Sequence, residues 1–318
     1  EKLIKAASSA GADIIKFQTY KAEKLTTKNA PRFWNWDGEK LKKGSQFDSY
    51  SNLDSFGKQE YVKVFEMCKK HKIEFMSTPF DEESVDMLIS IGMKAFKVAS
   101  CDITNFPLLE FIAKKKKPIL LSTGASNIDE IKKAVNLIKK NGNHKIAIMH
   151  CTLCYPTKPE DANLGALLDL KNNFPKNIIG LSDHTLGTKV ASASVLLGSK
   201  LIEKHFTFDK TLPISADHWL SLNEEDLFTL VKEVRFMEKI FGVKKKKKLK
   251  CEDLAHKYAR RSIVAKFDIK KGQILKLNML DMKRPGTGIS PDKLNSVLNK
   301  TLKKSINKDS LISLKDLN

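Results

Sequence analysis

Two histidines follow consecutive short apolar runs, and their spacing suggests a shared chemical role. His184 ends Leu-Ser-Asp-His, His205 ends Ile-Glu-Lys-His, and a helical stretch that begins near Gly187 separates them. Because a strand, a helix and a second strand form one βαβ unit, both imidazoles are expected at the carboxyl ends of neighbouring parallel strands. This placement predicts a divalent metal site, with water and a substrate oxygen completing the coordination, or an acid–base pair.

Other groups near these histidines allow several interpretations. A core imidazole or a lone general base is the alternative for each histidine. His150 is a weaker candidate, because it precedes a strand end by one residue and can face outward. Asp217 is expected to orient a sugar hydroxyl or to transfer a proton. Cys151 and Cys154 have Cys-x-x-Cys spacing, but the other cysteines form no second pair for zinc, so reduced thiols are expected.

Lysines and hydroxyls also gather at the predicted strand ends. A lysine inside an apolar strand is costly to bury unless its charge is paired, so Lys16 and Lys97 are expected to have a function. Each serine taken alone could cap the following helix. Lysines supply charge and hydroxyls supply directional hydrogen bonds, so together they predict a phosphorylated substrate. The hydroxyl residues are Thr78, Ser100, Ser122 and Ser182.

Seven apolar runs are predicted to be the strands that position these groups. They are residues 13–18, 74–78, 95–100, 118–122, 145–151, 177–182 and 201–205. A Gly-x-Gly-x-x-Gly or P-loop sequence would favour an open nucleotide-binding sheet, but the chain contains neither motif. A closed (β/α)₈ barrel needs eight strands, and the chain starts inside an amphipathic helix without methionine. The prediction is an α/β fold, a TIM (β/α)₈ barrel lacking its first strand in this chain, with that strand expected upstream of residue 1.

Length and charge set broad limits on the protein. The 318 residues can hold a barrel of roughly 240 residues and a small second domain. No apolar run approaches a bilayer span and no signal peptide is visible, so a cytoplasmic protein without membrane contact is expected. The net charge of +20 is mostly lysine, with runs at 114–117 and 244–248. These runs have little aromatic interleaving, so a solvated surface is favoured over a nucleic-acid interface.

The motifs, in this order and at these spacings, resemble the N-acetylneuraminate (sialic acid) synthases and related nonulosonate synthases. The matching segments are Lys-Phe-Gln-Thr at 16–19, Ser-Thr-Pro-Phe-Asp at 77–81, Lys-Val-Ala-Ser at 97–100, Leu-Ser-Thr-Gly at 121–124, Cys-Thr-x-x-Tyr-Pro-Thr at 151–157, Glu-Asp-x-Asn-Leu at 160–164, Gly-Leu-Ser-Asp-His-Thr at 180–185 and Glu-Lys-His-Phe-Thr at 203–207. The resemblance implies a transferase that condenses phosphoenolpyruvate with an open-chain N-acetylated amino sugar. The products would be a nine-carbon nonulosonic acid and phosphate, formed by C–O cleavage.

The resemblance also assigns expected roles to individual residues. In the family pattern, phosphoenolpyruvate is held by the positions of Lys16, Thr78, Lys97, Ser100, Ser122 and Ser182. The positions of His184 and His205 bind manganese, or alternatively magnesium or cobalt, which would polarise the sugar aldehyde. The positions of Gln18, Tyr155 and Asp217 contact the sugar. Lys97, Asp217 and the two histidines are therefore the expected catalytic residues.

The carboxyl-terminal part resembles the antifreeze-like (SAF) domain of these synthases. The predicted boundaries are residues 1–240 for the barrel, 241–258 for a lysine-rich linker and 259–318 for a small β-rich domain of the β-clip type. The resemblance implies a domain-swapped homodimer in which Arg284 contacts the sugar in the other subunit's barrel. An arginine in a surface turn is the alternative for Arg284. Relatives that make 3-deoxy sugar acids from phosphorylated sugars lack this tail.

Three departures from the family pattern bear on activity and substrate. The family's opening strand, with a glutamate that contacts the sugar and an Asn-His pair, is absent, so an unstable, inactive or only sugar-binding protein is the alternative for the chain as written. Leu153 stands where sialic acid synthases often carry asparagine, and leucine forms no side-chain hydrogen bond. A diacetamido-trideoxyhexose, leading to a legionaminic- or pseudaminic-type acid, is therefore the alternative sugar. Residues 213–217 replace the usual Gly-Pro-Asp, which predicts a different loop.

Overall fold

Seven parallel strands form one curled sheet in the computed structural model, which describes residues 1–34, 44–213 and 217–318. The strands are β1 Ile14–Thr19, β2 Glu74–Pro79, β3 Phe96–Val98, β4 Ile119–Ser122, β5 Ile146–Cys151, β6 Ile178–Asp183 and β7 Ile202–Lys204. They are ordered as in the sequence, so each strand pairs with the next and β1 and β7 form the two edges. Within the described ranges, no strand lies between β1 and β7. The predicted barrel-type α/β fold with seven strands is confirmed, and the strand bounds differ by at most two residues.

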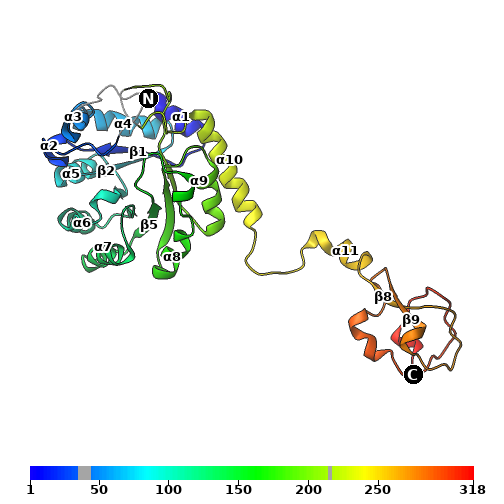
Figure 1. The fold of residues 1–318 in the computed structure, drawn as a ribbon. Coiled ribbons are helices and arrows are strands. Elements are labelled where there is room, and N and C mark those ends of the chain that lie inside the picture. Colours follow the sequence, from blue (N-terminus) through cyan, green and yellow to red (C-terminus); the bar gives the residue numbers. More distant parts are fainter. Residues whose placement is uncertain (35–43, 214–216) are drawn as a thin grey trace. The chain divides into compact units, whose positions relative to one another are not determined.

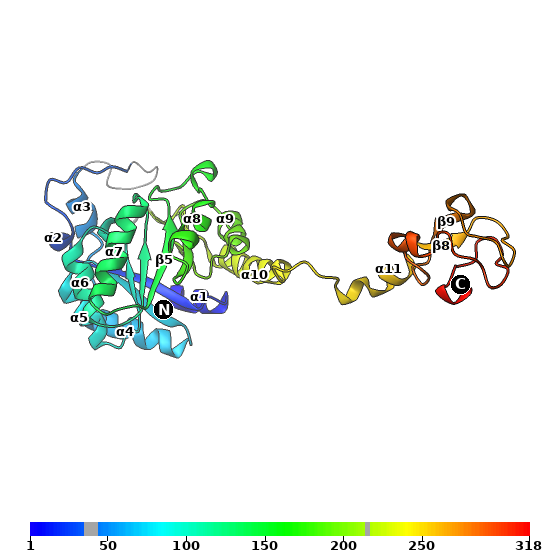
Figure 2. The ribbon, with the colours of Figure 1, turned by 90° about the horizontal axis from the view of Figure 1, so that it is seen from below.

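Helices lie around the outside of the strands (Figures 1 and 2). They are α1 Lys2–Ser9, α2 Ala22–Leu25, α3 Gln46–Ser51, α4 Lys58–Lys70, α5 Glu82–Ser90, α6 Phe106–Lys114, α7 Ile128–Lys140, α8 Ala166–Asn173, α9 Lys189–Ser194 and α10 Glu224–Phe241. Helix α7 shows why these segments are helical. Asn127 and Glu130 form a capping box at its start, and Ile131, Val135 and Ile138 recur at helical spacing and are buried.

The segment between the two histidine-bearing strands forms the expected βαβ connection. It contains α9 and a short 3₁₀ turn, Val195–Leu197. Gly198 ends this turn with a φ of +97°, a left-handed conformation that glycine adopts without a steric penalty. The chain then returns as β7, which pairs with β6 so that Asp183 lies opposite Lys204. The loops that carry His184 and His205 therefore begin side by side.

The chain divides into two units, Glu1–Gly242 and Val243–Asn318, and the second is small and β-rich as predicted. It contains α11 Asp253–Tyr258, β8 Ser262–Ala265 and β9 Leu280–Lys283, with β8 and β9 antiparallel. Isolated bridges, such as Ile269 with Ile306, join further segments around a core that includes Ile263 and Leu275. Helix α11 lies within residues 241–258, the segment predicted as a linker.

A helix that crosses a bilayer must be both long and apolar. In the part of the chain that the structure describes, no helix combines sufficient length with sufficient apolarity to cross a membrane.

Candidate active site

A cavity of about 930 Å³ opens at the carboxyl ends of the strands in the first unit. Parallel α/β folds place their active sites at this end, because the strand-to-helix loops gather there. Every site residue predicted within the barrel segment lines this one cavity, except the weaker candidate His150. These residues are Lys16, Gln18, Thr78, Lys97, Ser100, Ser122, Tyr155, Ser182, His184, His205 and Asp217.

One wall of the cavity, the charged wall, consists of Lys16, Lys97, Glu203 and the hydroxyls beside them. Lys97 is 3% exposed, and its Nζ donates to Ser122 Oγ at 2.7 Å and lies 3.6 Å from Glu203 Oε1. Lys16 Nζ lies 3.7 Å from the other carboxylate oxygen, Oε2. Two ammonium groups thus share one carboxylate, which leaves the wall a positive charge for an anionic ligand.

The pKa values follow from this arrangement. Burial lowers the pKa of Lys97, although the nearby Glu203 carboxylate opposes the change. Burial alone would raise the pKa of Glu203, but the charges of Lys16 and Lys97 hold it at about 2. Glu203 is therefore ionised at neutral pH, and it balances part of the lysine charge when no substrate is bound.

Hydroxyl groups from neighbouring strands surround the two lysines. Ser182 Oγ donates to Glu203 Oε1 at 2.8 Å, and Ser100 Oγ accepts from the Gly124 N–H at 2.9 Å. A side chain at residue 124 would place its Cβ only 2.9 Å from Ser100 Oγ and 3.1 Å from Cys151 Sγ, so this close approach requires glycine. Thr78 is buried at the same end of the sheet. The strand ends thus present directional donors beside the positive charge.

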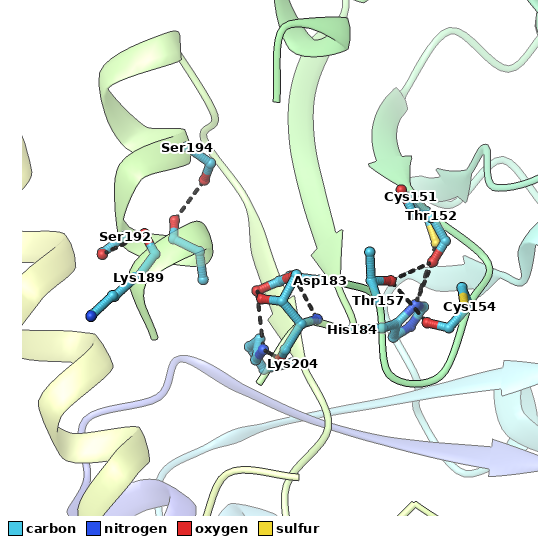
Figure 3. A network of polar contacts seen from close by, with 12 residues as sticks. Cys151, Thr152, Cys154, Thr157, Asp183, His184, Lys189, Ser192, Ser194 and Lys204 are labelled. Carbon is cyan, nitrogen blue, oxygen red and sulfur yellow. Dashed lines mark hydrogen bonds and ion pairs between the residues drawn. The ribbon is translucent and has the colours of Figure 1, made fainter. Parts of the chain in front are cut away.

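The two histidines lie close together, with ring centroids 5.3 Å apart. His184 Nδ1–H donates to the Thr152 carbonyl at 2.9 Å, so Nε2 carries the lone pair (Figure 3). His205 Nδ1 lies 3.4 Å from Asp217 Oδ2, which orients the second ring in a similar way. Burial and the neighbouring His205 lower the pKa of His184 to about 4, and burial lowers the pKa of His205. Both imidazoles are therefore neutral at physiological pH.

These features fit the divalent ion that the sequence predicts. A histidine that binds a metal must be neutral, and it usually donates its second ring N–H to a carbonyl or carboxylate. Among the described residues, no group of three or more His, Cys, Asp or Glu side chains is placed to hold a metal ion. His184 and His205 are the residues that would hold such an ion.

Aromatic rings form another wall, here called the aromatic wall, which consists of Tyr20, Tyr50 and Phe80. The Tyr20 ring packs edge-on against Tyr50 and Phe80, with centroid distances of 5.5 and 5.8 Å. Tyr155 lies over the histidines, 4.1 Å from the His184 ring and 5.7 Å from the His205 ring. Leu153 also lines the cavity. Of the predicted different loop at 213–217, residues 214–216 lie outside the described residues.

Two predicted candidates lie outside this cavity. Arg284 follows β9 in the second unit and is exposed, so its expected contact with a sugar stays a prediction. His150 is buried and donates from Nε2 to the Ala162 carbonyl at 2.9 Å, which matches the core-imidazole alternative. Sequence reasoning gave no role to Glu203. Its position two residues before His205 was the available signal, because alternate residues of a strand share a face.

Comparison with known proteins agrees with this fold. The NeuB family matches residues 3–246, and the SAF domain matches residues 260–318. The N,N'-diacetyllegionaminic acid synthase of Campylobacter jejuni is 40% identical over 314 residues, which are 98% of this chain and 93% of that protein. The N-acetylneuraminate-9-phosphate synthase of Homo sapiens is 32% identical over 314 residues, or 98% and 86% of the two chains.

A solved structure shows the same similarity. The N-acetylneuraminic acid (sialic acid) synthetase of Leptospira borgpetersenii, in complex with citrate, is 34% identical and superimposes with a TM-score of 0.71. The match covers 80% of this chain and 83% of that one. The fold and the site thus define a barrel protein of the class that contains sugar-acid synthases. The chain belongs to the NeuB family and carries the SAF domain at its carboxyl end.

Proposed function

We propose that this protein condenses phosphoenolpyruvate with an open-chain N-acetylated amino sugar to give a nine-carbon nonulosonic acid and phosphate. The observation that carries the proposal is that one cavity contains both a positively charged wall and a pair of neutral histidines. The charged wall, with Lys16 and Lys97, suits a small polyanion. The neutral pair His184 and His205 suits a divalent ion near a carbonyl group.

The charged wall would hold phosphoenolpyruvate and fix the direction of its C3 atom. Lys16 and Lys97 would neutralise its charge, while the hydroxyls of Ser100, Ser122 and Ser182 would donate to its oxygens. Thr78 lies at the same end of the sheet. In the reaction, C3 forms a carbon–carbon bond with the aldehyde carbon and water adds at C2. Phosphate then leaves with its bridging oxygen as the C2–O bond breaks, so the sugar gains the atoms of pyruvic acid, and the keto oxygen among them comes from water.

The histidine side of the cavity would bind the sugar. His184 and His205 would hold a divalent ion, for which manganese is the first candidate and magnesium or cobalt the alternatives, and this ion would polarise the aldehyde. Gln18 and Tyr155 line the cavity where they can bind sugar hydroxyls. The Asp217 carboxylate lies beside His205 and is placed to orient a hydroxyl or to accept its proton.

The cavity walls favour a diacetamido-trideoxyhexose, and hence a legionaminic-type product, over N-acetylmannosamine. Leu153 offers a sugar no hydrogen bond, and Tyr20, Tyr50 and Phe80 offer aromatic surface to methyl groups. A second acetamido group and a 6-methyl group carry more apolar surface than the hydroxyls of N-acetylmannosamine. The relative from Campylobacter jejuni named for diacetyllegionaminic acid is consistent with this choice.

Arg284 is proposed to contact the sugar bound in the barrel of a second subunit, within a domain-swapped homodimer. Its guanidinium is exposed in the second unit, next to the β8–β9 pair. A guanidinium presents several donors in a fixed plane, which suits recognition of hydroxyl and carbonyl oxygens. The site would then be complete only in the dimer.

The reaction is tested by measuring phosphate release from phosphoenolpyruvate with a panel of N-acetylated hexosamines, with and without manganese. We expect release that depends on both the metal and the aldehyde and that is fastest with the diacetamido sugar. His184→Ala and His205→Ala are expected to lower kcat at least about 100-fold, because each removes a metal ligand. His144→Ala is the matched control, since His144 is exposed and does not line the cavity. The proposal fails if no sugar supports metal-dependent release.

A further inference from the structure

Asp183 and Lys204 form a buried ion pair that the proposed reaction does not use. Lys204 Nζ lies 3.0 Å from Asp183 Oδ2, and the two side chains are 4% and 3% exposed (Figure 3). Neither residue lines the 930 Å³ cavity. The pair is therefore placed to act on the structure of the site rather than on a bound substrate.

The position of this pair in the sheet links it to both histidines. Asp183 and Lys204 are direct cross-strand partners in β6 and β7, and the next residues along the chain are His184 and His205. Because neighbouring side chains of a strand point to opposite faces, the pair lies behind the face that carries Ser182 and Glu203. It thus joins the two strand ends from which the imidazoles extend.

Further hydrogen bonds extend the pair to the turn that contains His184. Asp183 accepts from the Thr185 N–H at 2.9 Å and from Thr185 Oγ1 at 3.0 Å, while Lys204 donates to the Thr185 carbonyl. The backbone of residues 183–185 is therefore held from β7 as well as from its own strand. A shift of β7 against β6 would break these bonds and change the separation of the rings.

The neighbouring loop completes the attachment of His184. Its carbonyl accepts from the Thr157 N–H at 3.0 Å, and its Nδ1–H donates to Thr152 O. Backbone and ring are thus both fixed on the β5 side, whereas Asp183 and Lys204 fix the turn on the β7 side. Figure 3 shows these two sets of contacts on either side of His184.

Stability alone gives a weak reason to bury this pair. The desolvation of two charges largely cancels their attraction, so well-packed apolar residues of similar volume often support the fold equally well. A buried pair does, however, impose one geometry on the groups that it joins. We infer that Asp183 and Lys204 are positioning residues that set the separation of the His184 and His205 rings and thereby the affinity for the divalent ion. This inference rests on the metal site of the proposed function.

The test measures two quantities for the full chain of each variant. One is the affinity of the metal-free protein for Co²⁺, followed by visible absorption, and the other is the Tm in EDTA. The key variant is Asp183→Leu with Lys204→Met, which replaces both charges by apolar groups. We expect Co²⁺ affinity to fall about 10- to 100-fold and the absorption bands to shift, while the Tm in EDTA stays close to that of the parent protein. The matched control is Asp86→Leu with Lys115→Met, an ion pair on the outer helices, which should change neither the affinity nor the bands.

A second variant covers the case in which the double replacement does not fold. Asp183→Asn keeps the shape of the side chain and removes only its charge, and we expect about 10-fold weaker Co²⁺ binding with altered bands. Unchanged affinity and bands in whichever of these variants folds, or an affinity loss that only parallels a loss of Tm, would overturn the inference. Failure of the proposed metal site is distinguishable, because the parent protein would then bind no Co²⁺ or would bind it equally well after His184→Ala.

Discussion

The charged wall and the aromatic wall of the cavity are built in different ways. In the charged wall, Lys97, Glu203 and Ser122 have partners from other strands at 2.7 to 3.6 Å. In the aromatic wall, rings such as Tyr20 and Tyr50 pack edge-on with their centroids 5.5 Å apart. Tyr50 lies in the short helix α3 rather than in a strand. The first wall thus lies mostly within the strands, whereas the second lies just beyond them: Tyr20 and Phe80 directly follow β1 and β2, and Tyr50 lies in α3.

This difference suggests that the two walls have different functions. Groups fixed by the sheet cannot move without disturbing strand pairing, so they suit the step of the proposed reaction that all sugars share, the binding of phosphoenolpyruvate. Loop residues tolerate exchange, so they suit the recognition of one sugar among several. Changes in the charged wall should therefore affect all sugars alike, whereas changes at sugar-facing residues should alter the preference among sugars.

The largest effect is expected from Lys97→Met. The change removes a buried ammonium group from the charged wall, so kcat/KM for phosphoenolpyruvate should fall about 1000-fold. The loss should be equal for every sugar, because Lys97 belongs to the shared part of the site. Steady-state kinetics with two sugars measure both quantities. Lys94→Met is the control, since Lys94 is a surface lysine with a 73% exposed side chain. A loss confined to one sugar would contradict the division between the walls.

The sequence predicted the charged wall better than the aromatic wall, for a physical reason. Strand-end residues such as Lys16 and Ser182 are placed by strand periodicity and by parallel pairing, and both can be read from local patterns. Tyr50 lies in the short helix α3, 30 residues after Tyr20, and their contact is a tertiary one that local periodicity does not predict. Predicting the Asp183–Lys204 pair would have required the register between β6 and β7, which a single sequence does not provide.

The second prediction tests whether the sugar side is completed by another subunit. Arg284→Ala and His184→Ala should each lower activity, and mixed dimers should recover about a quarter of the parental activity after the two proteins are unfolded and refolded together. The reason is that half of the dimers are mixed, and each mixed dimer has one site with an intact barrel and an intact Arg284. Phosphate release from the refolded mixture measures this recovery.

The control mixture combines His184→Ala with Lys97→Met. Both changes lie in the barrel, so no mixed dimer contains an intact site and recovery should be absent. If the Arg284→Ala mixture also recovers nothing while each protein refolds as a dimer, Arg284 does not act across subunits. The residues that bind the sugar would then all come from one chain, and the difference between the charged wall and the aromatic wall would be a property of each subunit alone.

The smallest effect is expected from Leu153→Asn. Leu153 lies two residues before Tyr155 in the cavity, and asparagine adds an amide that can hydrogen-bond a sugar hydroxyl. We expect the ratio of kcat/KM for the diacetamido sugar over N-acetylmannosamine to fall about 10-fold, since a single hydrogen bond to the substrate changes selectivity by at least that order. The KM for phosphoenolpyruvate should stay the same, because the charged wall is unaltered.

Competition between the two sugars in one reaction, with products separated by chromatography, measures this ratio directly. Leu168→Asn is the control, because Leu168 lies in α8, is 49% exposed and does not line the cavity. A rise in the KM for phosphoenolpyruvate without a change in the sugar ratio would place Leu153 functionally with the charged wall. Leu153 could affect the charged wall through Gly124, whose N–H donates to Ser100 Oγ. The Cβ of Leu153 lies 3.1 Å from the position that a Cβ at Gly124 would occupy. The two readouts together therefore decide to which wall this residue belongs.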